Sequence, residues 1–149
     1  MDFVVAVDGS EESDRALDHA VEMTAATAGT LTAVHSVDPS VYDTGGSDPV
    51  VSPGDAEDRL VVESVEDAER RAERLLDDAA ERAAEAGVDV ETEILYGDPV
   101  EAIPSFATTE GYDGVFVGHR GLSEKHERVL GSVAKGVVER SSVPVTVVR

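Results

Sequence analysis

A glycine-rich segment between residues 118 and 132 carries the clearest chemistry in the sequence. Gly118 is followed by two residues and Gly121, then by nine residues and the pair Gly131-Ser132. An apolar run precedes the segment and a helix-like run follows it, so the context is strand, loop and helix. Glycines let backbone N–H groups approach an anion closely, and the following helix adds the positive end of its dipole. The segment therefore predicts a phosphate site, to which the Ser132 hydroxyl contributes.

Basic residues gather around the same segment. Residues 118–135 hold four bases, including both lysines of the chain, and two acids, which gives 4 − 2 = +2 in a chain of net charge −20. A basic island in an acidic protein concentrates anions locally. The alternative interpretation is a surface loop with solvated charges. Two other phosphate loops are excluded, because the chain has no Gly-Lys pair and no run of three close glycines after its first apolar segment.

The composition narrows the class of protein. Acidic residues number 32 against 12 lysines and arginines, so most of the surface repels nucleic acids and anionic membranes. Molar salt would screen the self-repulsion, and we therefore expect a salt-rich cytoplasm, as in a halophile. Cysteine is absent, and no apolar run approaches the roughly 18 residues of a membrane span. At 149 residues, the length predicts a single domain over residues 1–149.

The hydrophobic pattern predicts an α/β fold with a parallel sheet. Residues 3–7 and 114–117 are apolar throughout, which is typical of central strands buried on both faces. Residues 88–95 alternate, and the final strand, from Val143 to Val148, contains a proline, so both are predicted to lie at edges. With residues 31–37 as the second strand, the prediction is a five-stranded parallel sheet in the order 3-2-1-4-5 with helices on both faces.

Four helices are expected between these strands. The first follows a Ser10 N-cap and stops at Gly29, the third begins at Asp98, and the fourth covers residues 132–140. Residues 58–86 form the longest helix, whose buried face includes Leu75. Acid–base pairs four residues apart, such as Asp78 with Arg82, are expected on its exposed side.

The last helix has one unusual feature. Gly136 lies inside it, where glycine costs about 1 kcal/mol relative to alanine. A tight contact between helix and sheet is the expected reason. Val133 and Val138 are assigned to the buried side of this helix. Residues 38–57, rich in proline and glycine, are predicted to form a mobile loop at the ligand end of the sheet.

The chain resembles the universal stress protein family. The resemblance rests on the Gly-x2-Gly-x9-Gly-Ser pattern, on the opening VAVDGSEES at residues 5–13, on AVHSV at residues 33–37, on Gly97-Asp98-Pro99, and on the C-terminal VPVTVVR. It covers nearly the whole chain apart from residues 39–57. The glycine spacing marks the nucleotide-binding branch of that family, which shares the strand order 3-2-1-4-5.

The resemblance implies a site for ATP or another adenine nucleotide, with Mg²⁺ shared mostly with the phosphates. The glycines would shape the cradle, the first turn of the last helix would hold phosphate oxygens, and two further positions would take the nucleoside. The residues assigned in this way are Gly118, Arg120, Gly121, Gly131, Ser132, Val133, Asp8 and Ser36. Asp8 follows the first strand, so it is either a turn-forming acid or a ligand at the nucleoside end, away from the phosphates. Ser36 would act through its backbone.

Three functions remain open. The first is an ATP-binding regulatory dimer paired through the last strand, Val143 to Val148, because an apolar edge strand invites pairing and family members commonly dimerise there. The second is a slow ATPase or an adenylate-transferring enzyme, for which His119 and His126 are candidates only by their position in the loop. The third is an interaction module that holds no nucleotide.

Overall fold

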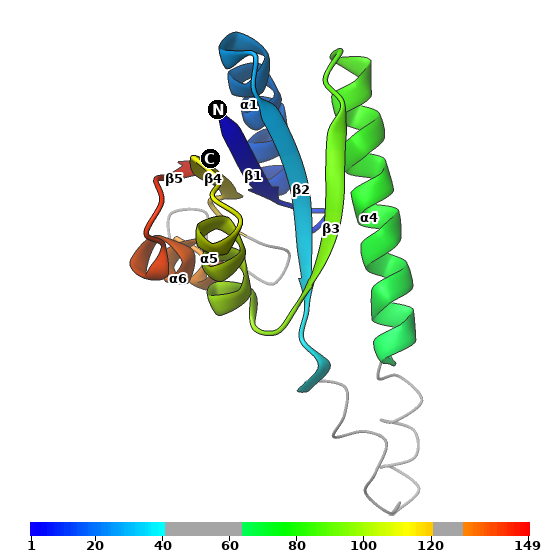
Figure 1. The fold of residues 1–149 in the computed structure, drawn as a ribbon. Helices are drawn as coiled ribbons and strands as arrows, with labels where there is room; N and C mark the ends of the chain where they lie inside the picture. Colours follow the sequence, from blue (N-terminus) through cyan, green and yellow to red (C-terminus); the bar gives the residue numbers. More distant parts are fainter. Residues whose placement is uncertain (41–63, 121–129) are drawn as a thin grey trace, which may run out of the picture.

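The computed structural model describes residues 1–40, 64–120 and 130–149. Within them, the chain forms a five-stranded parallel sheet in the order β3-β2-β1-β4-β5, so the predicted order is confirmed (Figure 1). The elements in chain order are β1 (Asp2–Ala6), α1 (Glu11–Thr27), β2 (Thr30–Val37), α4 (Val65–Glu85), β3 (Val90–Tyr96), α5 (Pro99–Thr109), β4 (Gly114–Gly118), α6 (Ser132–Arg140) and β5 (Val145–Val148).

The sheet is covered on both faces, as its apolar central strands require. Side chains of β1 alternate between two cores: Val5 packs with α1 and α4, whereas Val4 packs with α5 and α6. Both valines are fully buried, as is Val115 of β4 at 1% exposure. The edge strand β3 is largely exposed along its length, which agrees with its alternating sequence.

Polar caps fix where the helices begin. Ser10 caps α1 as predicted, by accepting a hydrogen bond from the N–H of Ser13 at 3.1 Å. Asp98 caps α5 in the predicted way, and Pro99 occupies its first turn. Pro104 lies inside α5, and the helix continues beyond it to Thr109. The long helix α4 begins at Val65 rather than near residue 58, because Ser64 is extended and caps it by accepting a hydrogen bond from the N–H of Asp67 at 3.2 Å. The predicted 38–57 loop lies outside the described residues from residue 41 onward.

The end of α1 and the buried side of α6 differ from the predictions. Ala28, not Gly29, takes the left-handed conformation that ends α1, with φ of 52°. A Cβ on Gly29 would lie 1.9 Å from the carbonyl oxygen of Met1, so close packing explains that glycine. Val133 and Val138 of α6 are 38% and 47% exposed rather than buried.

Gly136 is explained by a contact between two helices, not between helix and sheet. A Cβ at this position would lie 2.3 Å from Cγ1 of Val100, which belongs to α5. The absence of a side chain therefore lets α5 and α6 approach closely on their face of the sheet. The cost of glycine in a helix is offset by this packing.

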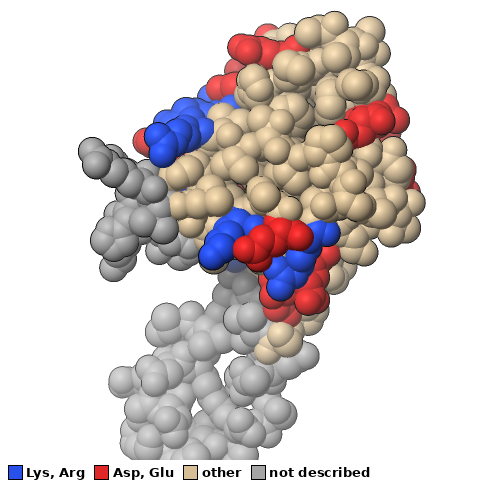
Figure 2. Space-filling model, turned by 90° about the vertical axis from the view of Figure 1, so that its left-hand side faces the viewer, with Lys and Arg blue, Asp and Glu red and all other residues tan. Residues whose placement is uncertain are grey.

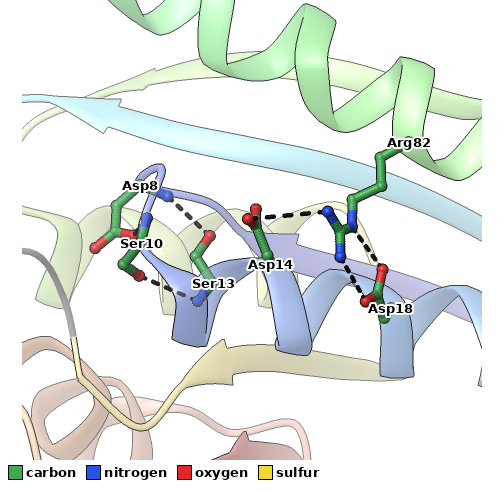
Figure 3. Close-up of polar contacts among 6 residues, drawn as sticks. All are labelled: Asp8, Ser10, Ser13, Asp14, Asp18 and Arg82. Carbon is green, nitrogen blue, oxygen red and sulfur yellow. Dashed lines mark hydrogen bonds and ion pairs between the residues drawn. The ribbon is translucent and has the colours of Figure 1, made fainter.

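A charged contact joins α1 to α4 on the opposite face. The guanidinium of Arg82 donates to both carboxylate oxygens of Asp18, at 2.7 and 2.8 Å, and lies 3.9 Å from Asp14 (Figure 3). The hydrogen bonds from Arg82 hold the pKa of the Asp18 carboxyl below its usual value. The sequence had paired Arg82 with Asp78 of its own helix. The bidentate fork to another helix is geometrically the better match for a carboxylate.

Candidate functional site

A cavity of about 510 Å³ opens at the carboxyl ends of β1 and β4. Strands β2 and β3 lie on one side of β1, whereas β4 and β5 lie on the other, so the order of the sheet switches between the parallel neighbours β1 and β4. Open α/β sheets bind ligands at such a switch point. Seven of the eight residues predicted from the sequence line this cavity: Asp8, Ser36, Gly118, Arg120, Gly131, Ser132 and Val133. The eighth, Gly121, lies outside the described residues.

Asp8 serves the turn between β1 and α1 and also lines the cavity. Its Oδ1 accepts a hydrogen bond from the N–H of Ser10 at 2.9 Å, and its own N–H donates to the Ser13 hydroxyl at 3.0 Å (Figure 3). The two interpretations left open by the sequence are therefore compatible. A carboxylate has about four lone-pair sites, so Asp8 keeps the capacity to accept from a ligand hydroxyl.

Gly118 is where β4 meets the first turn of α1. A Cβ at this position would lie 2.8 Å from the carbonyl carbon of Glu12 and 3.0 Å from the N of Ser13. Both neighbours are backbone atoms, which cannot swing away as a flexible side chain can. The glycine thus lets the end of β4 pack directly on α1, and brings the two sides of the cavity together.

The residue after Gly118 holds the glycine-rich segment to the rest of the fold. The N–H of His119 donates to the carbonyl of Val148 at 2.7 Å, and its carbonyl accepts from Gly131 at 2.8 Å. His119 is 6% exposed and does not line the cavity. The sequence made His119 a candidate catalytic group only by its position in the loop, because the pattern of a glycine-rich loop does not reveal that its first residues continue the sheet.

The N-terminus of α6 faces the cavity without a local negative charge. Its N-cap is Gly131, which has no side chain that could accept from the first turn, and the next three residues line the cavity. The other helices in the described ranges, α1, α4 and α5, each have a side-chain cap and an acidic residue in the first turn. An anion in the cavity would therefore meet the N–H groups and positive dipole end of α6.

The remainder of the lining is mainly apolar. It includes Ala6, Val7, Val34, Leu75, Ile103, Val117 and Ala134, which come from both faces of the sheet. On β2, Nδ1 of His35 lies 2.7 Å from the carbonyl oxygen of Val7, and the Ser36 hydroxyl donates to the carbonyl of Gly97 at 2.6 Å. The Ser36 hydroxyl therefore already has a hydrogen-bond partner within the protein, and a ligand would meet the backbone of Ser36 instead. This lining suits a flat, largely apolar ring.

Several cavity residues were missed by the sequence interpretation. Leu75 was assigned to the buried face of its helix, whereas Leu76 fills the core and Leu75 lines the cavity. Arg71 of α4 also lines it. Helical spacing assigns residues to faces of the helix, but it does not show how far along the sheet the helix extends.

Arg120 has a carboxylate partner that was not predicted. Its Nη2 donates to Oε1 of Glu12 at 2.6 Å, and the two side chains are 18% and 12% exposed. Glu12 also lies 3.6 Å from the guanidinium of Arg15. The hydrogen bond from its own backbone N–H and the bond from Arg120 hold the pKa of the Glu12 carboxyl below its usual value. Glu12 itself does not line the cavity.

Comparisons with known proteins agree with this arrangement. The family model for the universal stress protein family matches residues 1–149. The chain belongs to the universal stress protein family. The "Universal stress protein YxiE" of Bacillus subtilis is 33% identical over 147 residues, covering 99% of this chain and 97% of the relative.

Solved universal stress proteins share the whole fold. UspA from Lactobacillus plantarum superposes with a TM-score of 0.77 and 26% identity, covering 100% of this chain and 97% of that one. A universal stress protein solved in complex with cAMP has a TM-score of 0.70 and 30% identity, with the same two coverages.

Two features are absent from the described part of this universal stress protein. Within residues 1–40, 64–120 and 130–149, no three histidine, aspartate or glutamate side chains gather closely enough to hold a metal ion. In the same ranges, no helix has the length and apolar character that a membrane span requires.

Proposed function

We propose that this universal stress protein is a cytoplasmic regulatory protein of the stress response that binds an adenine nucleotide, with ATP as the ligand. The observation that carries the proposal is the N-terminus of α6. It is capped by Gly131, free of acidic residues in its first turn, and directed into a cavity at the sheet's switch point. This combination favours an anionic group, and the apolar lining beside it favours a ring.

The ligand would lie with its phosphates against Gly131, Ser132 and Val133. Asp8 would then face the ribose rather than the phosphates, because two negative groups repel each other. The base would lie against β2, near the backbone of Ser36. The relative solved with cAMP supports an adenine ligand in this family. Mg²⁺ would be bound mainly by the phosphates, since Mg²⁺ usually keeps few protein ligands in nucleotide sites.

The charges of the cavity support the same reading. Its described lining contains one carboxylate, Asp8, and two guanidinium groups, those of Arg71 and Arg120. The chain as a whole carries a net charge of −20. A site whose lining holds more basic than acidic groups, in a chain of strongly negative net charge, is suited to an anion.

The test is to purify the protein in molar KCl, denature it, and identify any released nucleotide by chromatography and mass. We expect ATP near one equivalent. Ser132→Ala should weaken ATP binding, and Gly131→Val should abolish it while the fold persists. Ser105→Ala, on the exposed side of α5, is the matched control and should bind as the wild type does. Absence of nucleotide in the purified protein, together with no binding of added ATP and Mg²⁺, would refute the proposal.

The alternative of a slow ATPase loses one of its two candidate groups. His119 is buried beside the last strand and does not line the cavity. His126 lies outside the described residues. No observation favours turnover over binding, so binding is the function we propose.

We also propose a homodimer through the last strand, Val143 to Val148. Strand β5 is at the edge of the sheet, and the neighbouring α6 exposes Val133 and Val138. Figure 2 shows that this side of the molecule is mostly uncharged, and residues 130–149 carry one acid against three bases. Self-repulsion at this surface is therefore weaker than the net charge of −20 would imply. We expect a dimer mass at micromolar concentration in molar KCl and a monomer for Thr146→Lys, since lysine at an exposed edge opposes pairing; a monomeric wild type would refute the dimer.

A further inference from the structure

The ion pair between Glu12 and Arg120 joins the two sides of the cavity. Glu12 belongs to the first turn of α1, which follows β1, and Arg120 lies two residues beyond the end of β4. The bond between them, 2.6 Å long, connects residues 108 positions apart in the chain. Directly behind it, Gly118 packs on the backbone of Glu12 with no room for a Cβ. Both the side chain and the backbone of Glu12 are therefore in contact with the segment that enters the phosphate site.

The two partners differ in their relation to the cavity. Arg120 lines it, whereas Glu12 stands behind Arg120 and does not. One amino group of the guanidinium is bound to Glu12, and a guanidinium has five N–H donors in a rigid plane. Fixing one edge of that plane orients the remaining donors. At 18% exposure, the Arg120 side chain is also far more confined than a free surface arginine.

We propose that Glu12 is the positioning residue for Arg120: it holds the guanidinium so that its remaining donors meet the phosphates of a bound nucleotide. This inference rests on the proposed nucleotide function. An arginine that is already immobilised loses less conformational entropy when a ligand binds, and this preorganisation raises affinity. Glu12 would act only on ligands that carry phosphate, because it acts only through Arg120.

A competing effect has to be weighed. The Glu12 carboxylate also brings a negative charge near the phosphates, and its removal would strengthen attraction to them. The Glu12 carboxylate is only 2.6 Å from the positive guanidinium of Arg120, so the pair acts on the ligand as a dipole, whose field falls off faster than that of a lone charge. Molar KCl weakens only the part of this field that passes through solvent, because nearly buried charges are screened little. We therefore expect positioning to outweigh repulsion.

The test compares Glu12→Ala, Glu12→Gln, Arg120→Ala and the double variant Glu12→Ala/Arg120→Ala by calorimetric titration in molar KCl. The ligands are adenosine, AMP and ATP with Mg²⁺. Glu12→Ala should weaken ATP binding roughly three- to tenfold, the factor expected when one long side chain must be immobilised on binding. Glu12→Gln keeps an acceptor oxygen and should stay within roughly twofold of the wild type. Glu22→Ala, an exposed position on α1, is the matched control.

The decisive readout is coupling. In the Arg120→Ala background, Glu12→Ala should have no further effect on ATP affinity, and adenosine affinity should be the same in every variant. Equal loss of adenosine and ATP binding, or additive losses in the double variant, would mean a merely structural role and would overturn the proposal. Unchanged or tighter ATP binding by Glu12→Ala would overturn it as well. A wild-type protein that binds none of the three ligands would instead refute the nucleotide function on which the proposal rests.

Discussion

Replacing Gly118 by alanine tests whether close backbone packing builds the site. The added Cβ would lie 2.8 Å from the carbonyl carbon of Glu12, 3.0 Å from its oxygen and 3.0 Å from the N of Ser13. Relief requires moving the end of β4 away from α1, and overpacking of this kind costs roughly 1–3 kcal/mol. Alanine regains roughly 0.5–1 kcal/mol relative to glycine within a strand. The two ranges differ by roughly 0–2.5 kcal/mol, and the middle of that span gives an expected net loss of about 1–2 kcal/mol.

The assay for this variant is urea unfolding followed by circular dichroism in molar KCl, with a thermal scan in parallel. For a chain of this size, about 1–2 kcal/mol corresponds to a fall in Tm of roughly 2–8 °C. Because the same shift separates the two sides of the cavity, ATP affinity should fall together with stability. A free energy of unfolding equal to that of the wild type, with full ATP binding, would show that the contact is slack and would refute the packing argument.

Three further predictions concern packing, acid and salt. Gly136→Ala should destabilise the protein in urea unfolding, because a Cβ 2.3 Å from Val100 costs roughly 1–3 kcal/mol against a helix gain of about 1 kcal/mol. The same substitution in a Val100→Ala background should then be neutral or stabilising; equal losses in both backgrounds would contradict the contact. Asp18→Asn should lose stability at neutral pH and differ less from the wild type in acid. The reason is that the lowered pKa of Asp18 stabilises the fold above the ordinary value of about 3.9, and this contribution disappears as the pH falls through the lowered pKa. If Tm varied with pH in the same way in Asp18→Asn and in the wild type, the contact with Arg82 would not be the source of the pH-dependent stability. Finally, Tm of the wild type should rise from low to molar KCl, and a salt-independent Tm would exclude self-repulsion as a limit on stability.

The fold could be predicted because its signals are local. Unbroken apolar runs mark β1 and β4 as central, and the alternation in β3 marks an edge. This pattern fits the order 3-2-1-4-5, which the resemblance to the universal stress protein family also implies. The Ser10 and Asp98 caps are equally local. The position of the cavity could be predicted because the glycine-rich segment and the end of β1 both lie at the same switch point of the sheet.

What could not be predicted depends on contacts between distant residues. Glu12 looks like an ordinary first-turn acid, and only the fold brings Arg120 to it from 108 positions away. Gly136 signals a close contact, but the sequence does not say that Val100 of another helix provides it. Leu75 and Leu76 fit the helical spacing of the buried face almost equally well. Which of the two reaches the cavity depends on the rotation and position of α4 over the sheet.

The pairing of β1 with β4 also bears on how the chain folds as it is made. Phe3 pairs with Gly114, so 114 − 3 = 111 residues separate the two central strands. At a synthesis rate of about 5–20 residues per second, one edge of β1 waits roughly 6–22 s for its partner. During that time the nascent chain presents an apolar strand with unpaired backbone groups. Crowded ribosomes translating this message would bring such edges close together, which makes early chaperone capture of the N-terminal half advantageous.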